Sequence, residues 1–489
     1  MHNGGRAETR HPAWAAVERL TAGVPVRLAL DVADQRVWTG LDRVVREFAI
    51  TRPGTLPSAA RMDGRRPLWR PRPPGESEVV LGLCHPKERI RYAALNWAAG
   101  RPALLPLVAV RCSDWAEPVR ERARTLLTDE LESVEGGALE NLTVLVVRLA
   151  RRWHGEFARE LVDRHLRQAR HRATVERLLL TPDRATRRTI HRLAVDEGLL
   201  SPARLASIAA QDTDVLIQDL CAEAALARIR NGTPDEVPEE ILRPLLTSRQ
   251  PRARSAGVTA LRRAGRHAEA APYLTDRSGM VRACARYVLR QGGQEPLAVY
   301  RELCADPRAL GSAPWAALGL AECGRPEDTE LLWPLLAHPA APVRARAVAG
   351  LRVLLTIDAT HTARLLPLLD DPAPAVARET ATALLPFADG LPEDRLLHRL
   401  AADRPVYTRL AAFRLLRAHS PAACLRAAVR LLNDTEPRLS ALAVPAVQQW
   451  IPGAVERHDR AEIAELLDQC TSLFSDRAMK WLRREAGIR

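Results

Sequence analysis

The sequence predicts an all-α, right-handed α-solenoid of roughly twelve helix pairs with a helical cap at each end. Two observations carry this prediction. Alanine, leucine and arginine are abundant among the 489 residues and aromatic residues make up 4% of them, a composition that favours helices over strands. A short turn motif also recurs about every 32 residues along most of the chain, and a fixed period of this length indicates a repeat architecture.

The repeating unit is clearest at 335–351, which reads LLAHPAAPVRARAVAGL. It joins the leucine-rich end of one helix, a polar turn with proline, and a second amphipathic helix rich in alanine. One turn position recurs along the array and serves as its register: His85, Asp114, Asp183, Asp212, Ser248, Asp276, Asp306, His338, Asp371, Asp403 and Asp434. The double interval between Asp114 and Asp183 predicts a degenerate unit near 148–170.

Two further positions recur with this register. An arginine follows it by six residues in many units, at Arg91, Arg120, Arg254, Arg282, Arg344 and Arg409. Each would lie in the first turn of the second helix, within reach of a turn carboxylate such as Asp276 or Asp114, so stacked units should form a ladder of ion pairs. A proline precedes the register by four residues in several units, at Pro244, Pro272, Pro334 and Pro367. We expect it to kink the first helix, because proline lacks a backbone donor.

With its kinking proline, Asp-Pro turn and Val-Arg opening of the second helix, the unit resembles the HEAT-repeat family, in particular the short bacterial HEAT-like repeats first named for phycobilisome lyases. The best copies are 331–355 and 365–385, and the resemblance covers 79–450. It implies an array of stacked helix pairs. It implies no single function, because HEAT arrays serve as scaffolds, as nucleic-acid binders and in a few enzymes.

The segments outside the array define the other expected domains. Residues 1–50 form an N-terminal helical cap, with an apolar stripe made of Trp38, Leu41, Val44, Val45 and Phe48. Residues 51–78 form a Pro/Arg-rich loop, which is either a solvated linker or an arm that touches phosphate or an acidic protein. Residues 79–450 form the array. Residues 451–489 form a C-terminal helical cap, with a helix that starts at Asp459, has a capping box to Glu462, and runs over 461–484.

The sequence lacks the motifs that characterise several kinds of metal, nucleotide and catalytic site. None of the eight cysteines forms a CxxC pair, and no His/Cys cluster has zinc spacing. Glycine-rich phosphate loops, an HExxH pair and a GxSxG elbow are also missing. The sequence therefore predicts no cofactor and no metal, and it favours a non-enzymatic protein. Because it has no apolar signal sequence and no run long enough to span a membrane, we expect a cytoplasmic protein without a membrane partner.

The formal net charge of +13 is concentrated in two blocks. Residues 148–192 contain thirteen arginines and five carboxylates, and residues 241–268 contain seven arginines and no carboxylate. The intervening residues 193–240 contain three arginines and ten carboxylates. The candidate binding residues of these basic stripes are Arg151, Arg152, Arg184, Arg187, Arg188, Arg249, Arg252 and Arg254. Either they line one face and grip phosphates, or they pair with carboxylates of adjacent units.

The leading functional prediction is a non-enzymatic scaffold or adaptor that presents an extended surface to a protein partner. The alternative is a nucleic-acid-binding solenoid that uses the arginine stripes, including a DNA glycosylase for alkylated bases. Such glycosylases have HEAT-like repeats and place an aspartate and aromatic residues in a basic groove. The aromatic candidates here are Trp115, which stands beside Asp114, and Trp153. The sequence leaves the partner's identity, any catalytic residue and the oligomeric state open.

Overall fold

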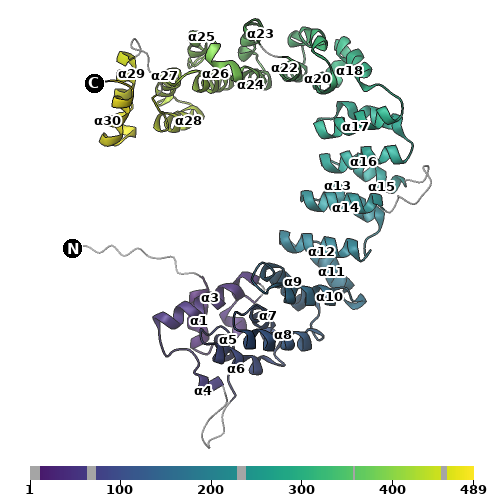
Figure 1. The fold of residues 1–489 in the computed structure, drawn as a ribbon, viewed down its shortest axis with the longest axis vertical. Coiled ribbons are helices and arrows are strands. Elements are labelled where there is room, and N and C mark those ends of the chain that lie inside the picture. The colour runs from purple at the N-terminus through teal and green to yellow at the C-terminus, as the bar shows by residue number, and fades with distance from the viewer. Residues whose placement is uncertain are drawn as a thin grey trace, which may run out of the picture. The chain divides into compact units, whose positions relative to one another are not determined.

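The computed structural model describes residues 12–32, 34–62, 73–227, 238–355, 358–452 and 460–488. In these ranges every regular element is a helix, as the sequence predicts (Figure 1). The chain forms two compact units, Met1–Arg230 and Asn231–Arg489. No helix in the described ranges is long and apolar enough to cross a membrane.

The first unit begins with α1 (Pro12–Thr21), α2 (Val26–Ala29) and α3 (Gln35–Thr51). The Asp34 side chain accepts a hydrogen bond from the backbone N–H of Arg36 and so caps α3. The predicted apolar stripe is buried, because α3 packs against α1, α7 and α9. The stripe consists of Trp38, Leu41, Val44, Val45 and Phe48.

Helix pairs follow in chain order in the rest of the first unit (Figure 1). They are α5 (Glu76–Leu83) with α6 (Glu88–Ala98), α7 (Leu105–Arg111) with α8 (Glu117–Leu131), α9 (Gly136–Leu149) with α10 (Glu156–Leu166), α11 (Arg172–Leu178) with α12 (Arg184–Asp196), and α13 (Pro202–Gln211) with α14 (Val215–Ala227). The two helices of each pair pack on each other, and α8 and α14 also pack on the preceding second helices α6 and α12. The predicted degenerate unit is the pair α9–α10.

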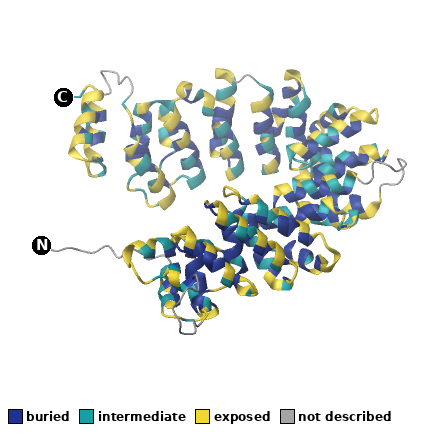
Figure 2. Cartoon of the chain, turned by 60° about the horizontal axis from the view of Figure 1, so that its bottom comes forward, coloured by how far each residue is buried: buried dark blue, intermediate teal, exposed yellow. Residues whose placement is uncertain are grey.

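The second unit, taken by itself, has the same two-layer arrangement. Its second helices are α16 (Pro251–Arg263), α17 (Gly279–Gln291), α20 (Ala316–Cys323), α22 (Ala341–Leu354), α24 (Pro374–Leu384), α26 (Val406–His419) and α28 (Pro437–Gln448). The elements that pack against them as a first layer are, in the same order, α15 (Glu239–Leu246), η3 (His267–Thr275), α18 (Pro296–Ala305), α21 (Thr329–Leu332) with η5 (Pro334–Ala337), α23 (Ala359–Leu365) with η6 (Leu366–Asp370), η7 (Leu385–Gly390) with α25 (Glu393–His398), and α27 (Pro421–Leu431). Buried residues gather between the packed helices of each unit (Figure 2).

The proline of the first helix acts differently from a simple kink. At Pro334 and Pro367 the α-helix gives way to a tighter 3-10 segment: α21 (Thr329–Leu332) precedes η5 (Pro334–Ala337), and α23 (Ala359–Leu365) precedes η6 (Leu366–Asp370). Pro272 lies inside the 3-10 helix η3, while Pro244 is accommodated within α15. Because proline cannot donate to the fourth preceding carbonyl, the chain winds into the tighter i→i+3 pattern there.

The predicted ladder of ion pairs joins consecutive units at Arg91, Arg254, Arg344 and Arg409. At the other two predicted positions it is not formed with a turn carboxylate in the described structure: Arg120 lies beside Glu121 of its own helix, and Arg282 pairs with Glu322 of α20. Arg254 donates from Nε and Nη2 to Asp276 of the next turn at 2.8 Å each, while its Nη1 donates to the carbonyl of Ser248 in its own turn. Arg344 repeats this arrangement with Asp371 and the carbonyl of His338. The same geometry joins Arg91 to Asp114, and Arg409 also reaches Asp434. Arg254 and Arg344 therefore each hydrogen-bond a backbone carbonyl of their own turn and the aspartate side chain of the next turn.

Two predictions about the segments outside the array need correction. The expected loop over 51–78 is packed through Met62, because α4 (Ala59–Met62) buries Met62 and the carbonyl of Met62 accepts a hydrogen bond from Trp97 Nε1. The C-terminal run over 461–484 is two helices, α29 (Arg460–Gln469) and α30 (Asp476–Glu485), because Ser475 caps a new helix. The predicted helix start at Asp459 lies outside the described residues.

Candidate functional site

The first basic block is largely neutralised by carboxylates of neighbouring units. Arg184 and Arg188 both donate from Nε to Asp214 Oδ2, at 2.6 and 2.8 Å, and Arg187 lies 3.3 Å from Asp212. Their partners belong to the acidic segment that follows the block in the sequence. Further pairs hold other arginines of the block: Arg148–Asp183, Arg159–Asp163, Arg167–Glu197, Arg170–Glu132 and Arg177–Glu140. Most of its charge is thus compensated within the first unit.

The turn between α9 and α10 holds two predicted arginines away from carboxylates. Arg151 and Arg152 are exposed there, and neither makes an ion pair within the described residues. Although Arg152 is exposed as a residue, partial desolvation by the surrounding protein lowers the pKa of its guanidinium, and the attraction of Asp42 opposes this. The adjacent Trp153 is 84% exposed, and its ring lies 5.8 Å from that of His154. This turn therefore presents two arginines and an aromatic ring to solvent.

The second basic block, in the second unit, mixes structural and exposed arginines. Arg254 is 7% exposed and its guanidinium lies on Asp276, so it belongs to the ladder and is not available to a phosphate. Arg249 and Arg252 are exposed. The prediction that arginines of the two blocks bind phosphates together is not tested by these contacts. Arg254 no longer belongs among its candidate residues, because its guanidinium is held by Asp276.

The aspartate beside Trp115 is not placed for catalysis in an open groove. Asp114 is fully buried at the side chain and accepts hydrogen bonds from Arg91 and Arg111. Trp115 is 66% exposed, with the Arg91 guanidinium carbon 5.4 Å from its ring centre. The aspartate is therefore part of the ladder, and Trp115 covers a ladder arginine.

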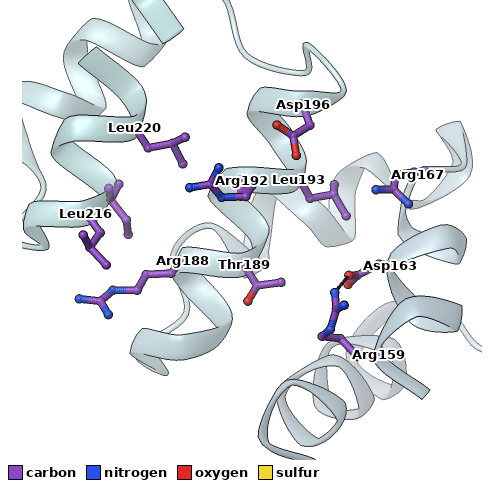
Figure 3. Close-up of a pocket in the computed structure, with 11 residues that line it drawn as sticks. Arg159, Asp163, Arg167, Arg188, Thr189, Arg192, Leu193, Asp196, Leu216 and Leu220 are labelled. Atoms are coloured by element: carbon purple, nitrogen blue, oxygen red, sulfur yellow. Dashed lines mark hydrogen bonds and ion pairs between the residues drawn. The ribbon is translucent and has the colours of Figure 1, made fainter. Parts of the chain in front are cut away.

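A groove on the second helices α10, α12 and α14 brings residues of the first basic block together with apolar side chains. Its volume is about 480 Å³ (Figure 3). We call it the α12 groove, and it is lined by Arg159, Asp163, Arg167, Arg188, Thr189, Arg192, Leu193, Asp196, Leu216, Ile217 and Leu220. Leu193 and Ile217 are buried and form its floor. Leu216 is 56% exposed and stands at its edge.

The wall formed by α10 contains a carboxylate that is poorly satisfied. Asp163 is 8% exposed, and its Oδ2 accepts a hydrogen bond from Arg159 Nη1 at 2.5 Å. Its Oδ1 is buried without a hydrogen-bond partner in the described structure. Burial raises the pKa of Asp163, although Arg159 and Arg167 oppose this. Keeping the Asp163 carboxylate ionised in this position therefore lowers the stability of the folded chain.

The α12 helix carries two opposite charges that the described structure leaves unpaired. Arg192 extends from α12 toward Leu220 of α14, and Asp196 lies one turn further along α12 (Figure 3). Both side chains are exposed, and neither makes an ion pair within the described residues. Arg159, Arg167 and Arg188, which also line the groove, are each held by a carboxylate. Arg192 is therefore the one arginine of the groove that makes no ion pair within the described residues.

Sequence reasoning missed Arg192 and the leucines of α14 as site residues. Arg192 differs in no sequence feature from the paired arginines around it. A signal did exist in α14, where Val215, Leu216 and Ile217 are three consecutive apolar residues. Three consecutive residues span more than one face of a helix, so a helix that packs on one face exposes at least one of them. Leu216 is that residue, together with Val215 at 37% exposure.

A second cavity, of about 740 Å³, lies near the start of the first unit. Its walls come from the residues around α2, from Trp38 of α3, and from the first turns of α5, α7 and α9. Glu76 lines it and accepts a hydrogen bond from the backbone N–H of Val26, which holds α2 against α5. No group of three His, Cys, Asp or Glu side chains in the described ranges could hold a metal ion.

Comparison with known proteins relates the chain to others by fold alone. The sequence matches no protein-family model and no curated protein. Yeast importin-beta (Kap95p) is a similar solved structure, with a TM-score of 0.40 and 12% identity over 95% of this chain and 65% of that one. The karyopherin Kap121p gives 0.34 and 12% over 83% and 56%, and the C-terminal fragment of the Chaetomium thermophilum cohesin loader SCC2 gives 0.36 and 14% over 94% and 42%. The chain thus spans about two thirds or less of the length of these similar structures.

Proposed function

We propose that the chain is a non-enzymatic HEAT-like scaffold or adaptor that binds a protein partner through its second helices, with the α12 groove as one contact. The observation that supports this most is the mixed chemistry of that groove. It offers apolar side chains beside Arg192, which makes no ion pair within the described residues, while the other arginines of the groove each contact a carboxylate. Protein surfaces provide apolar and charged groups together, whereas a nucleic-acid backbone provides mainly phosphates.

Nucleic-acid binding is the alternative function, and a different observation favours it. The turn between α9 and α10 exposes Arg151 and Arg152 next to Trp153, which combines cations with a surface for base stacking. The pairing of Arg184, Arg187 and Arg188 reduces the charge that this surface can offer to phosphates. The burial of Asp114 likewise weakens the glycosylase form of this alternative.

Two finer assignments accompany the proposal. The turn motif supports membership of the short bacterial HEAT-like repeats, with the array over 79–450 between helical caps.

The second assignment concerns the cellular setting. The described structure contains eight free cysteines, most of them buried, and burial raises the pKa of Cys112 to about 12. Unpaired thiols in a helical core support a reducing, cytoplasmic setting.

The test is to identify what the intact chain binds. A tagged chain would be incubated with a nuclease-treated extract, and a protein that it retains would be purified and titrated against it. Duplex DNA would be titrated in parallel by fluorescence anisotropy at about 50 and about 200 mM salt. We expect saturable binding of the protein and weak binding of DNA at both salt concentrations. DNA binding that falls about a thousand-fold between them, without a protein partner, would contradict the proposal.

A further inference from the structure

We infer that the α12 groove binds an acidic amphipathic segment of the partner protein, with apolar side chains against α14 and a carboxylate on Arg192. The inference rests on the proposed protein-binding function and adds the chemical class of the ligand. Three features of the groove support this inference: its lining side chains, its volume, and the two charged residues in it that make no ion pair within the described residues. Figure 3 shows the lining side chains.

The apolar part of the groove determines how such a segment would lie. Leu216 and Leu220 project from α14 above the buried floor of Leu193 and Ile217. A volume of about 480 Å³ accepts a few apolar side chains. It is too small for a whole helix, which is about 10 Å across with its side chains. The segment would therefore lie across the second helices and insert apolar residues at helical spacing, as amphipathic helices do in other grooves.

The charged side chains of the groove determine the sign of the charge that its ligand should carry. Arg159, Arg167 and Arg188 are each within 2.8 Å of a carboxylate oxygen, although Arg188 shares its partner, Asp214, with Arg184. Arg192 has no ion-pair partner in the described structure, and its guanidinium stands beside apolar side chains that reduce the local dielectric constant. A ligand carboxylate would compensate this charge and remain next to the leucines.

Asp196 limits where that carboxylate can lie. It is one helical turn from Arg192 on the same face of α12, and it has no ion-pair partner in the described ranges. It repels a second negative charge at that end of the groove. A regularly charged polyanion would meet Asp196 as well as Arg192, whereas a protein segment can place its carboxylate over Arg192 alone. This favours an acidic amphipathic segment over a nucleic acid.

The experiment uses the full-length chain and two fluorescein-labelled helical peptides as probes. Both peptides carry leucines at helical spacing, and they differ in having glutamates or lysines at the flanking positions. Fluorescence anisotropy measures the dissociation constant of each peptide at low and high salt. We expect the glutamate peptide to bind more tightly than the lysine peptide, and we expect the difference to shrink at high salt because Arg192 is exposed. Equal affinities, or no binding of the glutamate peptide, would overturn the inference.

Three variants on neighbouring helices localise the effect. Arg192→Glu should weaken binding of the glutamate peptide by about tenfold and reverse the preference, whereas Asp196→Lys should strengthen it. Arg164→Glu is the matched control, because Arg164 is an exposed arginine of α10 that does not line the groove and has no ion-pair partner in the described structure. Its affinity should equal that of the wild type. An unchanged affinity in Arg192→Glu would refute the inference.

Failure of the inference and failure of the proposed function give different results. If the purified protein partner binds wild type and Arg192→Glu equally well, the scaffold function stands and the inference fails. If the chain binds DNA and no protein, the proposed function itself fails. Leu216→Asp should weaken both peptides, because it removes the exposed apolar side chain that they share as a contact. Melting curves of all variants should coincide with that of the wild type, since the replaced side chains are exposed.

Discussion

Arg91 and Asp114 face each other across consecutive turns with both side chains fully buried. Arg91 Nε lies 2.9 Å from Asp114 Oδ2, and Arg91 Nη2 lies 2.8 Å from Oδ1. Arg111 Nη1 donates to the same Oδ2 at 2.7 Å. The carboxylate thus accepts hydrogen bonds from two buried guanidinium groups, of which Arg111 also contacts Asp42, and it links the two consecutive units.

Replacing Asp114 with alanine should strongly destabilise the first unit. The change leaves Arg91 buried without a counter-charge and removes one of the two carboxylates that contact Arg111. Breaking a buried pair in this way costs about 3–5 kcal/mol. Urea unfolding followed by circular dichroism would measure the loss.

The matched comparison is Arg344→Ala in the second unit. Arg344 is 13% exposed at the side chain, so water can partly solvate the groups that it leaves. We expect a smaller loss of stability than for Asp114→Ala. Equal losses would mean that burial does not determine the strength of the ladder pairs.

Acid should destabilise the array through the ladder carboxylates. Burial alone would raise the pKa of Asp371 and Asp276, but the hydrogen bonds from Arg344 and Arg254 outweigh it and hold both pKa values below the usual 3.8. A carboxyl whose pKa is lowered by folding stabilises the folded state above its unfolded pKa, and this stabilisation is lost as the pH falls toward the folded value. The melting temperature should therefore drop steeply once the pH falls below about 4.

Two variants test the origin of that drop. Asp371→Asn should lower the melting temperature near neutral pH and make its decline in acid shallower. Asp403→Asn is the control, because Asp403 has the same turn position but is exposed and makes no ion pair in the described structure. It should melt like the wild type at every pH. A decline of unchanged steepness in Asp371→Asn would show that the ladder is not its cause.

Asp163→Asn should have the opposite effect and stabilise the chain at pH 7. Burial raises the pKa of Asp163, so the folded state favours its neutral form and is destabilised as the pH rises through the interval above the unfolded pKa. Asparagine is neutral at every pH. The gain in melting temperature should be present at pH 7 and vanish near pH 3, where Asp163 is protonated in both states.

Asp196→Asn provides the comparison for this prediction. Asp196 lines the same groove but is exposed, so its replacement should leave the melting temperature unchanged at both pH values. A loss of stability in Asp163→Asn at pH 7 would mean that the ion pair with Arg159 outweighs the burial of the carboxyl.

The sequence was sufficient to predict the helix pairs but not the binding surface. The ladder could be anticipated because Arg254 and Asp276 occupy fixed positions relative to each turn, and stacking brings such positions together wherever they recur. Arg188 and Arg192 look alike in the sequence, since both lie on α12 among other arginines. Their difference depends on whether a carboxylate of the next unit comes within reach. Asp214 stands two residues beyond the register position Asp212, and that displacement cannot be read from the period.

The tight contact between Gly319 and Tyr300 gives the last prediction. A Cβ atom at Gly319 would lie 2.3 Å from Tyr300 Cε1 and 2.5 Å from Cζ. Tyr300 is fully buried, and its hydroxyl donates to the carbonyl of Leu274 at 2.8 Å, so its ring has little freedom to move away. Gly319→Ala should therefore destabilise the second unit by about 1–3 kcal/mol. This loss would occur although alanine favours a helix by about 1 kcal/mol over glycine.

A double-mutant cycle separates the steric clash from other effects of the alanine. In a Tyr300→Ala background the ring is absent, so adding Gly319→Ala should cost nothing and should recover the helix preference of alanine. Gly311→Ala is the control, because a Cβ atom there meets no atom within 4 Å. Urea unfolding of the four members of the cycle gives the coupling free energy. An equal cost of Gly319→Ala in both backgrounds would show that Tyr300 is not what requires glycine at this position, and that the close packing of α20 against α18 has another origin.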